Sequence, residues 1–461
     1  MDGAGPVTRK IRFLAPYISA KLAITILSGL LAGCSGPQPP RVNPAPALSL
    51  AELKQRVGEI RALPFKPETA LSGPPAPPSA GVADELSGQS LAQLARAYKR
   101  VGLIAESVDL AKAMMEFARL KRLSVYEARR ESLVIASEAA KLGPALAGEP
   151  SEGSDQIPAV LVLTQELQEQ HFRWQEKLER VGPEDRKLAF RALADGDALL
   201  VGLSYLERNR QKLDWAQAII RFAAELERMG ARLPELLKQE LVFPYREGSQ
   251  FVEWARASKG WSGVNALYAD PPLSSAQILH PEKYYIRREA PLRITPFGFK
   301  RQMKENPVVD QTLGEFRIQL LLGANQPRKE AGQIASGWTG DHLSAYPDGE
   351  GLVTAWVSAW SGDQEAQSFQ RAFQSVLERR HRLRFNKVLG QTGGGKADLR
   401  TGRSVILQIR GAVVLLLDGI ASARALEASE EIWKDLEIAP EPSELSFDSA
   451  KGPAQLSLRR R

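Results

Sequence analysis

Hydrophobic residues recur every three or four positions through much of residues 89–240, which is the spacing of an amphipathic helix. The clearest stripes are Leu91, Leu94, Ala95 and Tyr98; Val160, Leu163, Leu167, His171, Trp174 and Leu178; and Trp215, Ile219, Phe222 and Leu226. The second stripe predicts one helix over 158–178. A short apolar run at 132–136 fits a strand. The pattern therefore predicts a mostly helical first half, which ends near Pro234 and Pro244.

From residue 241 onward the pattern becomes mixed. Short helices are expected around Phe251 and Val264, and longer ones over 308–323 and 363–380. Apolar runs at 343–346 and 352–360 flank a Pro-Asp-Gly-Glu-Gly turn, and runs at 404–409 and 412–417 flank Arg-Gly, so each pair predicts a hairpin. We expect an α+β protein, in which a smaller α/β half containing a β-meander follows the helical half.

Proline-rich stretches interrupt these patterns near the start of the chain. The segments at 35–46 and 72–81 favour extended spacers, with one short helix between them around residues 50–63. We expect the following organisation: a leader at 1–33, a tether and linker at 34–88, a helical domain at 89–240, an α/β domain at 241–436, and a flexible tail at 437–461.

Charge changes this picture little. The 461 residues carry a formal charge of +7, and the leader holds four basic residues and one acidic residue, so about +4 remains without it. The only dense basic run is Arg459-Arg460-Arg461. We expect no nucleic-acid partner.

The single cysteine, Cys34, lies just after a charged leader and an apolar run at 22–31. That layout is typical of a secretory signal peptide, and the run is about half the ~20 residues that a spanning helix needs. The string Leu31-Ala32-Gly33-Cys34 resembles a bacterial lipobox. The resemblance implies a lipoprotein whose Cys34 carries acyl chains such as palmitate and anchors it in the membrane. The alternative is a thiol that follows an ordinary signal peptide or membrane anchor.

The residue after the cysteine is Ser35 rather than the aspartate that favours retention in the inner membrane. In a Gram-negative host the resemblance therefore implies the outer membrane more than the inner one. Because the chain has no second cysteine, no intramolecular disulfide can form.

A set of strings, in their order and spacing over residues 90–420, resembles a family of bacterial secreted or lipid-anchored proteins with a zincin-type HExxH motif. In that family a helix reading roughly HELTHALQDQHF is followed about thirty residues later by EGDA. The corresponding strings here are LVLTQELQEQHF at 161–172, DGDA at 195–198, FPY at 243–245, GW at 260–261, HPEKY at 280–284, TLGE at 312–315 and GWTGD at 337–341. The resemblance implies a zincin-like fold for the helical half.

The zinc motif itself is degenerate. Leu161 and Gln165 stand at the two histidine positions, Val162 at the general base and Asp195 at the third ligand. Leucine cannot bind zinc, glutamine is a poor donor, and valine cannot accept a proton from metal-bound water. We therefore expect no metal, no cofactor and no catalytic residue. The helices bearing Gln165 and Asp195 should face one another and bring Leu161 to the same place. Because a buried charge needs a partner, Gln165 or a nearby Arg or Lys should contact Asp195.

No other motif replaces the missing one. The four histidines show no metal-ligand spacing, and His280 before Pro281 is expected to fix a loop by hydrogen bonding. Gly393-Gly394-Gly395-Lys396 lacks the spacing of a phosphate-binding loop, and Ala397 follows the lysine.

Three functions remain open. The first is a catalytically inactive binding or scaffold module that recognises an envelope protein. The second is an active hydrolase or peptidase with an atypical site, which would use the carboxylates of Asp195, Asp197, Glu166 and Glu169. The third is a structural component of an envelope assembly.

Overall fold

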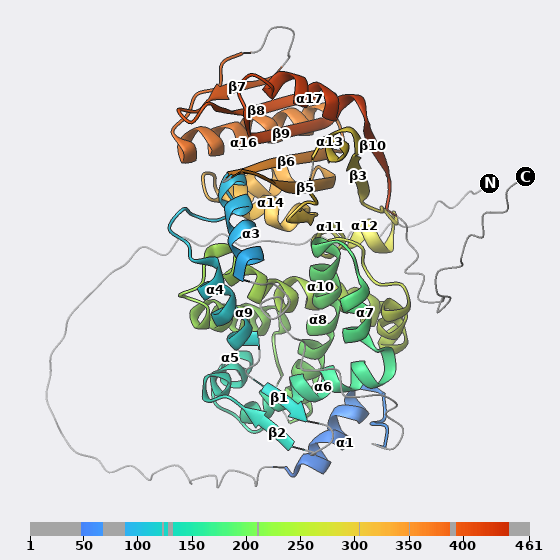
Figure 1. The fold of residues 1–461 in the computed structure, drawn as a ribbon. Helices are drawn as coiled ribbons and strands as arrows, with labels where there is room; N and C mark the ends of the chain where they lie inside the picture. The colour runs from blue at the N-terminus through green and yellow to red at the C-terminus, as the bar shows by residue number, and fades with distance from the viewer. Residues whose placement is uncertain are drawn as a thin grey trace, which may run out of the picture. The chain divides into compact units, whose positions relative to one another are not determined.

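The computed structural model describes residues 48–67, 88–121, 124–127, 132–209, 212–303, 305–349, 351–387 and 393–441 (Figure 1). The leader, Cys34, the proline-rich spacers and residues 442–461 lie outside these ranges. All the described residues belong to one compact unit. Its helical first half and the sheet of its second half confirm the α+β class. Within the described ranges, no helix combines the length and the apolar character needed to cross a membrane.

The first half is built around α8 (Glu184–Arg208), which is buried on nearly every side. The small, apolar sequence of its middle allows this, since a helix without a polar face can pack against neighbours all round. The other helices of this half are α1 (Leu50–Arg61), α3 (Gly88–Val101), α4 (Leu110–Lys121), α5 (Leu142–Ala147), α6 (Ile157–Phe172), α7 (Trp174–Arg180), α9 (Trp215–Met229) and α10 (Glu235–Ala269). A two-stranded ladder, β1 (Ser124–Glu127) with β2 (Ser132–Ile135), lies beside them, and short 3-10 helices occupy Ser137–Lys141 and Ser154–Gln156.

Two backbone breaks divide helices in this half. The single helix expected over 158–178 is wrong, because Arg173 adopts a left-handed conformation (φ 52°) that ends α6 and starts α7. Within α10, Gly260 has a φ of 61°, which a residue without a Cβ adopts easily. This kink separates the segments around Phe251 and Val264, which were expected as two helices.

The second half carries a six-stranded antiparallel sheet with the order β4-β5-β6-β9-β8-β7. Its elements are α11 (Ser275–Leu279), α12 (Pro281–Tyr285), β3 (Leu292–Pro296), α13 (Phe297–Gln302), β4 (Val309–Gln311), α14 (Gly314–Gly323), α15 (Arg328–Ala335), β5 (Trp338–Asp348), β6 (Gly351–Trp360), α16 (Asp363–His381), β7 (Gly394–Asp398), β8 (Arg403–Arg410), β9 (Val413–Ala421), α17 (Ala425–Lys434) and β10 (Leu436–Pro440).

The sheet joins a hairpin to a meander. Strands β5 and β6 form the first expected hairpin, and β8 and β9 form the second. After β6, α16 carries the chain to the far edge of the sheet, where β7 begins. Strands β7, β8 and β9 then pair in sequence back toward the centre, so that β9 pairs with β6. The β-meander therefore accounts for only half of the sheet.

Helices cover both faces of the sheet, α16 on one and α17 on the other. Leu407 and Leu416 share a buried cluster with Phe373 of α16, whereas their neighbours Ile406 and Leu415 share one with Ile432 of α17. Because side chains alternate across a strand, these clusters lie on opposite faces. Burial on both faces explains why β9 is nearly all apolar.

Three further expectations are corrected. Residues 309–311 form β4 rather than the start of a helix, and α14 begins only at Gly314. Residues 437–440, the start of the expected flexible tail, belong to β10, which pairs with β3. The domain boundary expected between residues 240 and 241 lies inside α10.

Candidate functional site

Helices α6 and α8 face one another where Gln165 and Asp195 lie, as expected. Gln165 of α6 donates through Nε2 to Asp195 Oδ1 at 2.7 Å. One turn on, Gln168 donates to the carbonyl oxygen of Ala194 at 3.0 Å. The contact predicted between Gln165 and Asp195 is therefore confirmed.

Asp195 is only 7% exposed. Burial raises the pKa of its carboxyl group, while Lys121, the Gln165 hydrogen bond and Arg191 oppose that shift. The amide of Gln165 and the positive charges of Lys121 and Arg191 thus partly compensate the buried negative charge of Asp195.

Leu161 does not join this pair. Its Cδ2 would lie 3.5 Å from a Cβ added at Gly202, which is about two turns beyond Asp195 along α8. The Gln165–Asp195 part of the expected grouping is thus present as a hydrogen bond, and Leu161 lies beside Gly202 of α8. Val162 is half-buried and offers no proton acceptor.

Leu161, Val162, Gln165 and Asp195 do not fit a zinc ion, because among these four side chains one carboxylate and one amide could serve as metal ligands. Elsewhere among the described residues, no group of three or more His, Cys, Asp or Glu side chains is placed to hold a metal.

A second buried pair lies two residues further along α8. Arg61 Nε is 2.9 Å from Asp197 Oδ1, and both side chains are fully buried. Tyr268 donates its hydroxyl to Asp197 Oδ2 at 2.9 Å. The Arg61 guanidinium lies 4.7 Å from the ring centroid of Trp261, within the range of a cation–π contact.

Arg61 was not among the expected site residues, because the segment that forms α1 was expected to be part of a linker. A signal was present in the capping box of Ser49 and Glu52, which starts a helix with buried Leu53 and Val57.

Two glycines allow α8 and α10 to approach closely beside these pairs. A Cβ at Gly196 would lie 2.3 Å from the carbonyl carbon of Gly248, and one at Gly248 would lie 2.0 Å from the Ala192 oxygen. Because no side chain fits there, Gly196 of the string at 195–198 and Gly248 allow the two helix backbones to touch.

The later strings meet at Asp341. Its Oδ1 and Oδ2 accept hydrogen bonds from the backbone of Leu313 and Gly314, both at 2.8 Å. The indole groups of Trp338 and Trp356 also donate to it, at 2.9 and 3.1 Å. The strings at 312–315 and 337–341 thus form a buried structural joint.

His280 extends the joint. Its Nε2 is 2.6 Å from Glu315 Oε1, and Lys283 donates to Glu315 Oε2 at 3.3 Å and to the Ser336 carbonyl at 3.1 Å. Glu315 is 2% exposed, so these contacts satisfy a buried carboxylate. They also confirm that His280 fixes its loop by hydrogen bonding.

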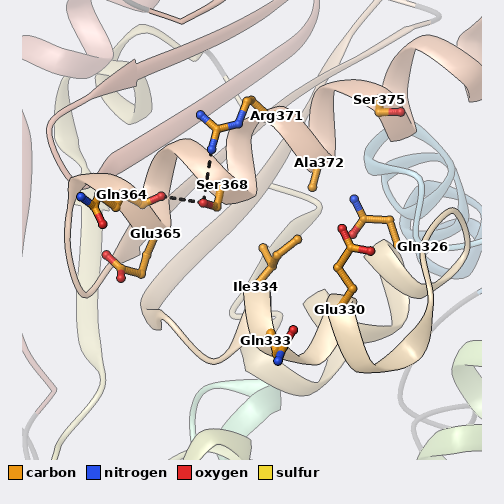
Figure 2. Close-up of a pocket in the computed structure, with 10 residues that line it drawn as sticks. All are labelled: Gln326, Glu330, Gln333, Ile334, Gln364, Glu365, Ser368, Arg371, Ala372 and Ser375. Carbon is orange, nitrogen blue, oxygen red and sulfur yellow. Dashed lines mark hydrogen bonds between the residues drawn. The ribbon is translucent and has the colours of Figure 1, made fainter.

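An open groove lies between α15 and α16, with a volume of about 560 Å³. Figure 2 shows the side chains that line it, namely Gln326, Glu330, Gln333, Ile334, Gln364, Glu365, Ser368, Arg371, Ala372 and Ser375. None of these residues belongs to a motif that the sequence analysis singled out.

Residues 301–430 match the model of a family described as a domain of unknown function (DUF8575). The match contains the groove and the Asp341 side of the joint, whereas Gln165 and Asp195 precede it. No curated protein matches the chain, and no solved structure does.

Proposed function

We propose that this protein is a lipid-anchored envelope protein whose zincin-like helical half is catalytically inactive and whose body acts as a binding or scaffold module. The observation that supports this most is the 2.7 Å hydrogen bond from Gln165 to Asp195. In the strings that resemble the zincin-type family, Asp195 corresponds to a metal ligand, and this bond engages its carboxylate.

The chemistry of the neighbouring positions supports the same proposal. A zinc peptidase needs a base that takes a proton from metal-bound water, and Val162 cannot do so. Gln165 offers only an amide, and Leu161 makes an apolar contact with α8.

The other carboxylates weighed for an atypical hydrolase are engaged by structural donors. Asp197 accepts from Arg61 and Tyr268, as described above. Glu166 accepts from the Gln170 amide at 2.9 Å, and Glu169 accepts from the Gln175 backbone at 2.8 Å. Burial raises the pKa of both glutamates, but neither pairs with a described nucleophile or histidine.

The anchoring part of the proposal rests on the lipobox-like string that ends at Cys34. Several acyl chains on one residue would hold the protein at a membrane permanently, since each buried methylene contributes about 0.8 kcal/mol. The body would then meet its partner, an envelope protein, at the membrane surface.

The test is a measurement of metal content and of peptide hydrolysis on the full chain purified in detergent without chelators. We expect substoichiometric zinc and no hydrolysis of an unstructured protein such as casein, with or without added zinc. Stoichiometric zinc that is lost on Asp195→Ala, or hydrolysis that a chelator abolishes, would overturn the proposal. Hydrolysis that resists chelators and disappears in Glu166→Gln or Glu169→Gln would favour the atypical hydrolase instead.

A further inference from the structure

The groove between α15 and α16 is lined by one face of each helix. On α16, Glu365, Ser368, Ala372 and Ser375 recur at intervals of three and four, which places them on one side of the helix. With Gln364 this stripe runs along about 16 Å of α16. That length matches about five residues of extended polypeptide.

Most of the side chains that line the groove are polar, and Ile334 and Ala372 are the apolar ones. Ala372 is buried and Ile334 is half-buried, and the short side chains of Ser368 and Ser375 leave the middle of the groove open (Figure 2). Pockets for small organic ligands are mostly apolar and aromatic. This groove has no aromatic side chain in its lining, so a hydrogen-bonding chain suits it better than a flat, apolar ligand.

Three amide side chains give the groove hydrogen-bonding capacity of both kinds. Gln326, Gln333 and Gln364 each carry a carbonyl acceptor and an amide donor. A peptide backbone presents the same two groups at every residue.

The three charged side chains of the groove are exposed and, like other exposed charges such as Glu427, form no ion pair among the described residues. They are Glu330, Glu365 and Arg371, and Arg371 only donates to the Ser368 hydroxyl at 3.4 Å. Some other helix glutamates do pair: Glu253 contacts Arg256 at 3.0 Å and Glu235 contacts Lys238. The groove therefore presents two unneutralised carboxylates and one guanidinium.

We propose that this groove binds an extended, polar peptide segment of a partner protein that carries basic side chains. The inference rests on the proposed binding function and locates the binding site in the groove between α15 and α16. Lysine or arginine side chains of the segment pair with Glu330 and Glu365, which lie near opposite ends of the groove in Figure 2, and the amides bind its backbone.

The same charges argue against other occupants. An anionic lipid surface or a nucleic acid attracts clustered cations, whereas the groove is net negative. All ten lining residues lie within residues 301–430, so the groove belongs to the part of the chain that matches a family model.

The test uses the full chain in detergent and three fluorescein-labelled decapeptides. All three have a Gly/Ser framework, and they carry three lysines, three glutamates or no charge. We expect fluorescence anisotropy to detect binding of the lysine peptide at least tenfold tighter than of the other two, and to show weaker binding at high salt. Combining Glu330→Gln with Glu365→Gln should weaken that binding at least tenfold. Glu427→Gln, which removes an exposed glutamate of α17 outside the groove, should not.

The inference is overturned if the three peptides bind alike, if none binds, or if the double variant binds the lysine peptide as the unmodified protein does. Circular dichroism and thermal unfolding confirm that the variants are folded. The assay of metal and peptidase activity is independent of this one. If the protein binds no zinc, hydrolyses no substrate and does not prefer the lysine peptide, only the proposed groove is rejected. Hydrolysis that a chelator abolishes rejects the proposed function, whatever the groove binds.

Discussion

Arg61 and Asp197 form a fully buried ion pair, with Nε 2.9 Å from Oδ1, between the first described helix and the central helix of the fold. Two nitrogens of the Arg61 guanidinium have no hydrogen-bond partner in the described structure, so the Asp197 carboxylate is the main compensation for that charge. Helix α1 is thus part of the core rather than part of a linker.

Removing Asp197 should be strongly destabilising. In Asp197→Ala, the buried guanidinium loses its counter-charge, which typically costs about 3–5 kcal/mol. Urea denaturation followed by circular dichroism measures this loss. The matched control is Glu59→Ala, whose pair with Arg208 is 52–53% exposed, and it should change the free energy of unfolding by less than about 1 kcal/mol. Equal effects would show that Arg61 is solvated.

Replacing Gln165 should lower the free energy of unfolding, because Asp195 is buried and loses its hydrogen-bond donor. In Gln165→Leu the carboxylate loses its amide donor, so its pKa rises further and stability falls by about 1–3 kcal/mol near neutral pH. Near pH 4 the loss should be smaller, because a protonated Asp195 carries no charge. Gln217→Leu, at an exposed glutamine of α9, is the control and should have little effect at either pH.

Asp185 should make stability depend on pH in an identifiable way. Burial raises its pKa to about 7, although the Ser275 backbone donates to Oδ2 at 2.9 Å. Because the folded protein holds this proton more tightly than the unfolded chain, the stabilisation is present below about pH 4 and is lost as the pH rises through about 7.

Urea unfolding across this range should therefore give a shallower fall in Asp185→Asn than in the unmodified protein, by up to about 1.4 kcal/mol per pH unit. Glu149→Gln, at an exposed position, should keep the original slope. A slope that Asp185→Asn leaves unchanged would contradict the assignment.

The close approach of α8 and α10 should make Gly196 intolerant of any side chain. Gly196→Ala places a methyl group 2.3 Å from the Gly248 backbone, so the helices must separate, at a cost of about 2 kcal/mol or more. Gly182→Ala meets no atom within 4 Å and should be neutral or stabilise by up to about 1 kcal/mol. Thermal unfolding of the two variants compares them directly.

Cys34→Ala should release the protein from membranes without unfolding it. Cys34 is the proposed anchor residue and precedes the first described helix, so we expect its loss to leave the melting temperature of the body unchanged. Membrane fractionation of expressing cells, followed by carbonate extraction, is the measurement. A variant that stays in the carbonate-resistant membrane fraction would indicate a retained membrane helix.

Local sequence signals predicted the parts of this fold that form locally. The hairpin of β5 and β6 was found because its turn and the two apolar runs beside it are adjacent in the chain. The pairings of β6 with β9 and of β3 with β10 were not found, because they depend on packing between distant segments.

Some of the polar contacts could also be predicted from the sequence, and others could not. Gln165 and Asp195 were paired through the resemblance to a zinc motif, which carries spatial information. Arg61 gave no such signal, since an arginine that ends a helix is usually solvated. The groove was missed because the polar face of α16 has the composition of any exposed helix face.

The pairing of β10 with β3 also sets an order of folding. Leu292 begins the strand whose partner ends at Pro440, so β3 cannot complete its ladder until the chain beyond α17 has been synthesised. The hairpins of the six-stranded sheet can close earlier, because their loop-closure entropy is small. The β3–β10 ladder is therefore the last of the described strand pairings that can form as the chain emerges, and a chain truncated before β10 would leave the edge of β3 unpaired and open to aggregation.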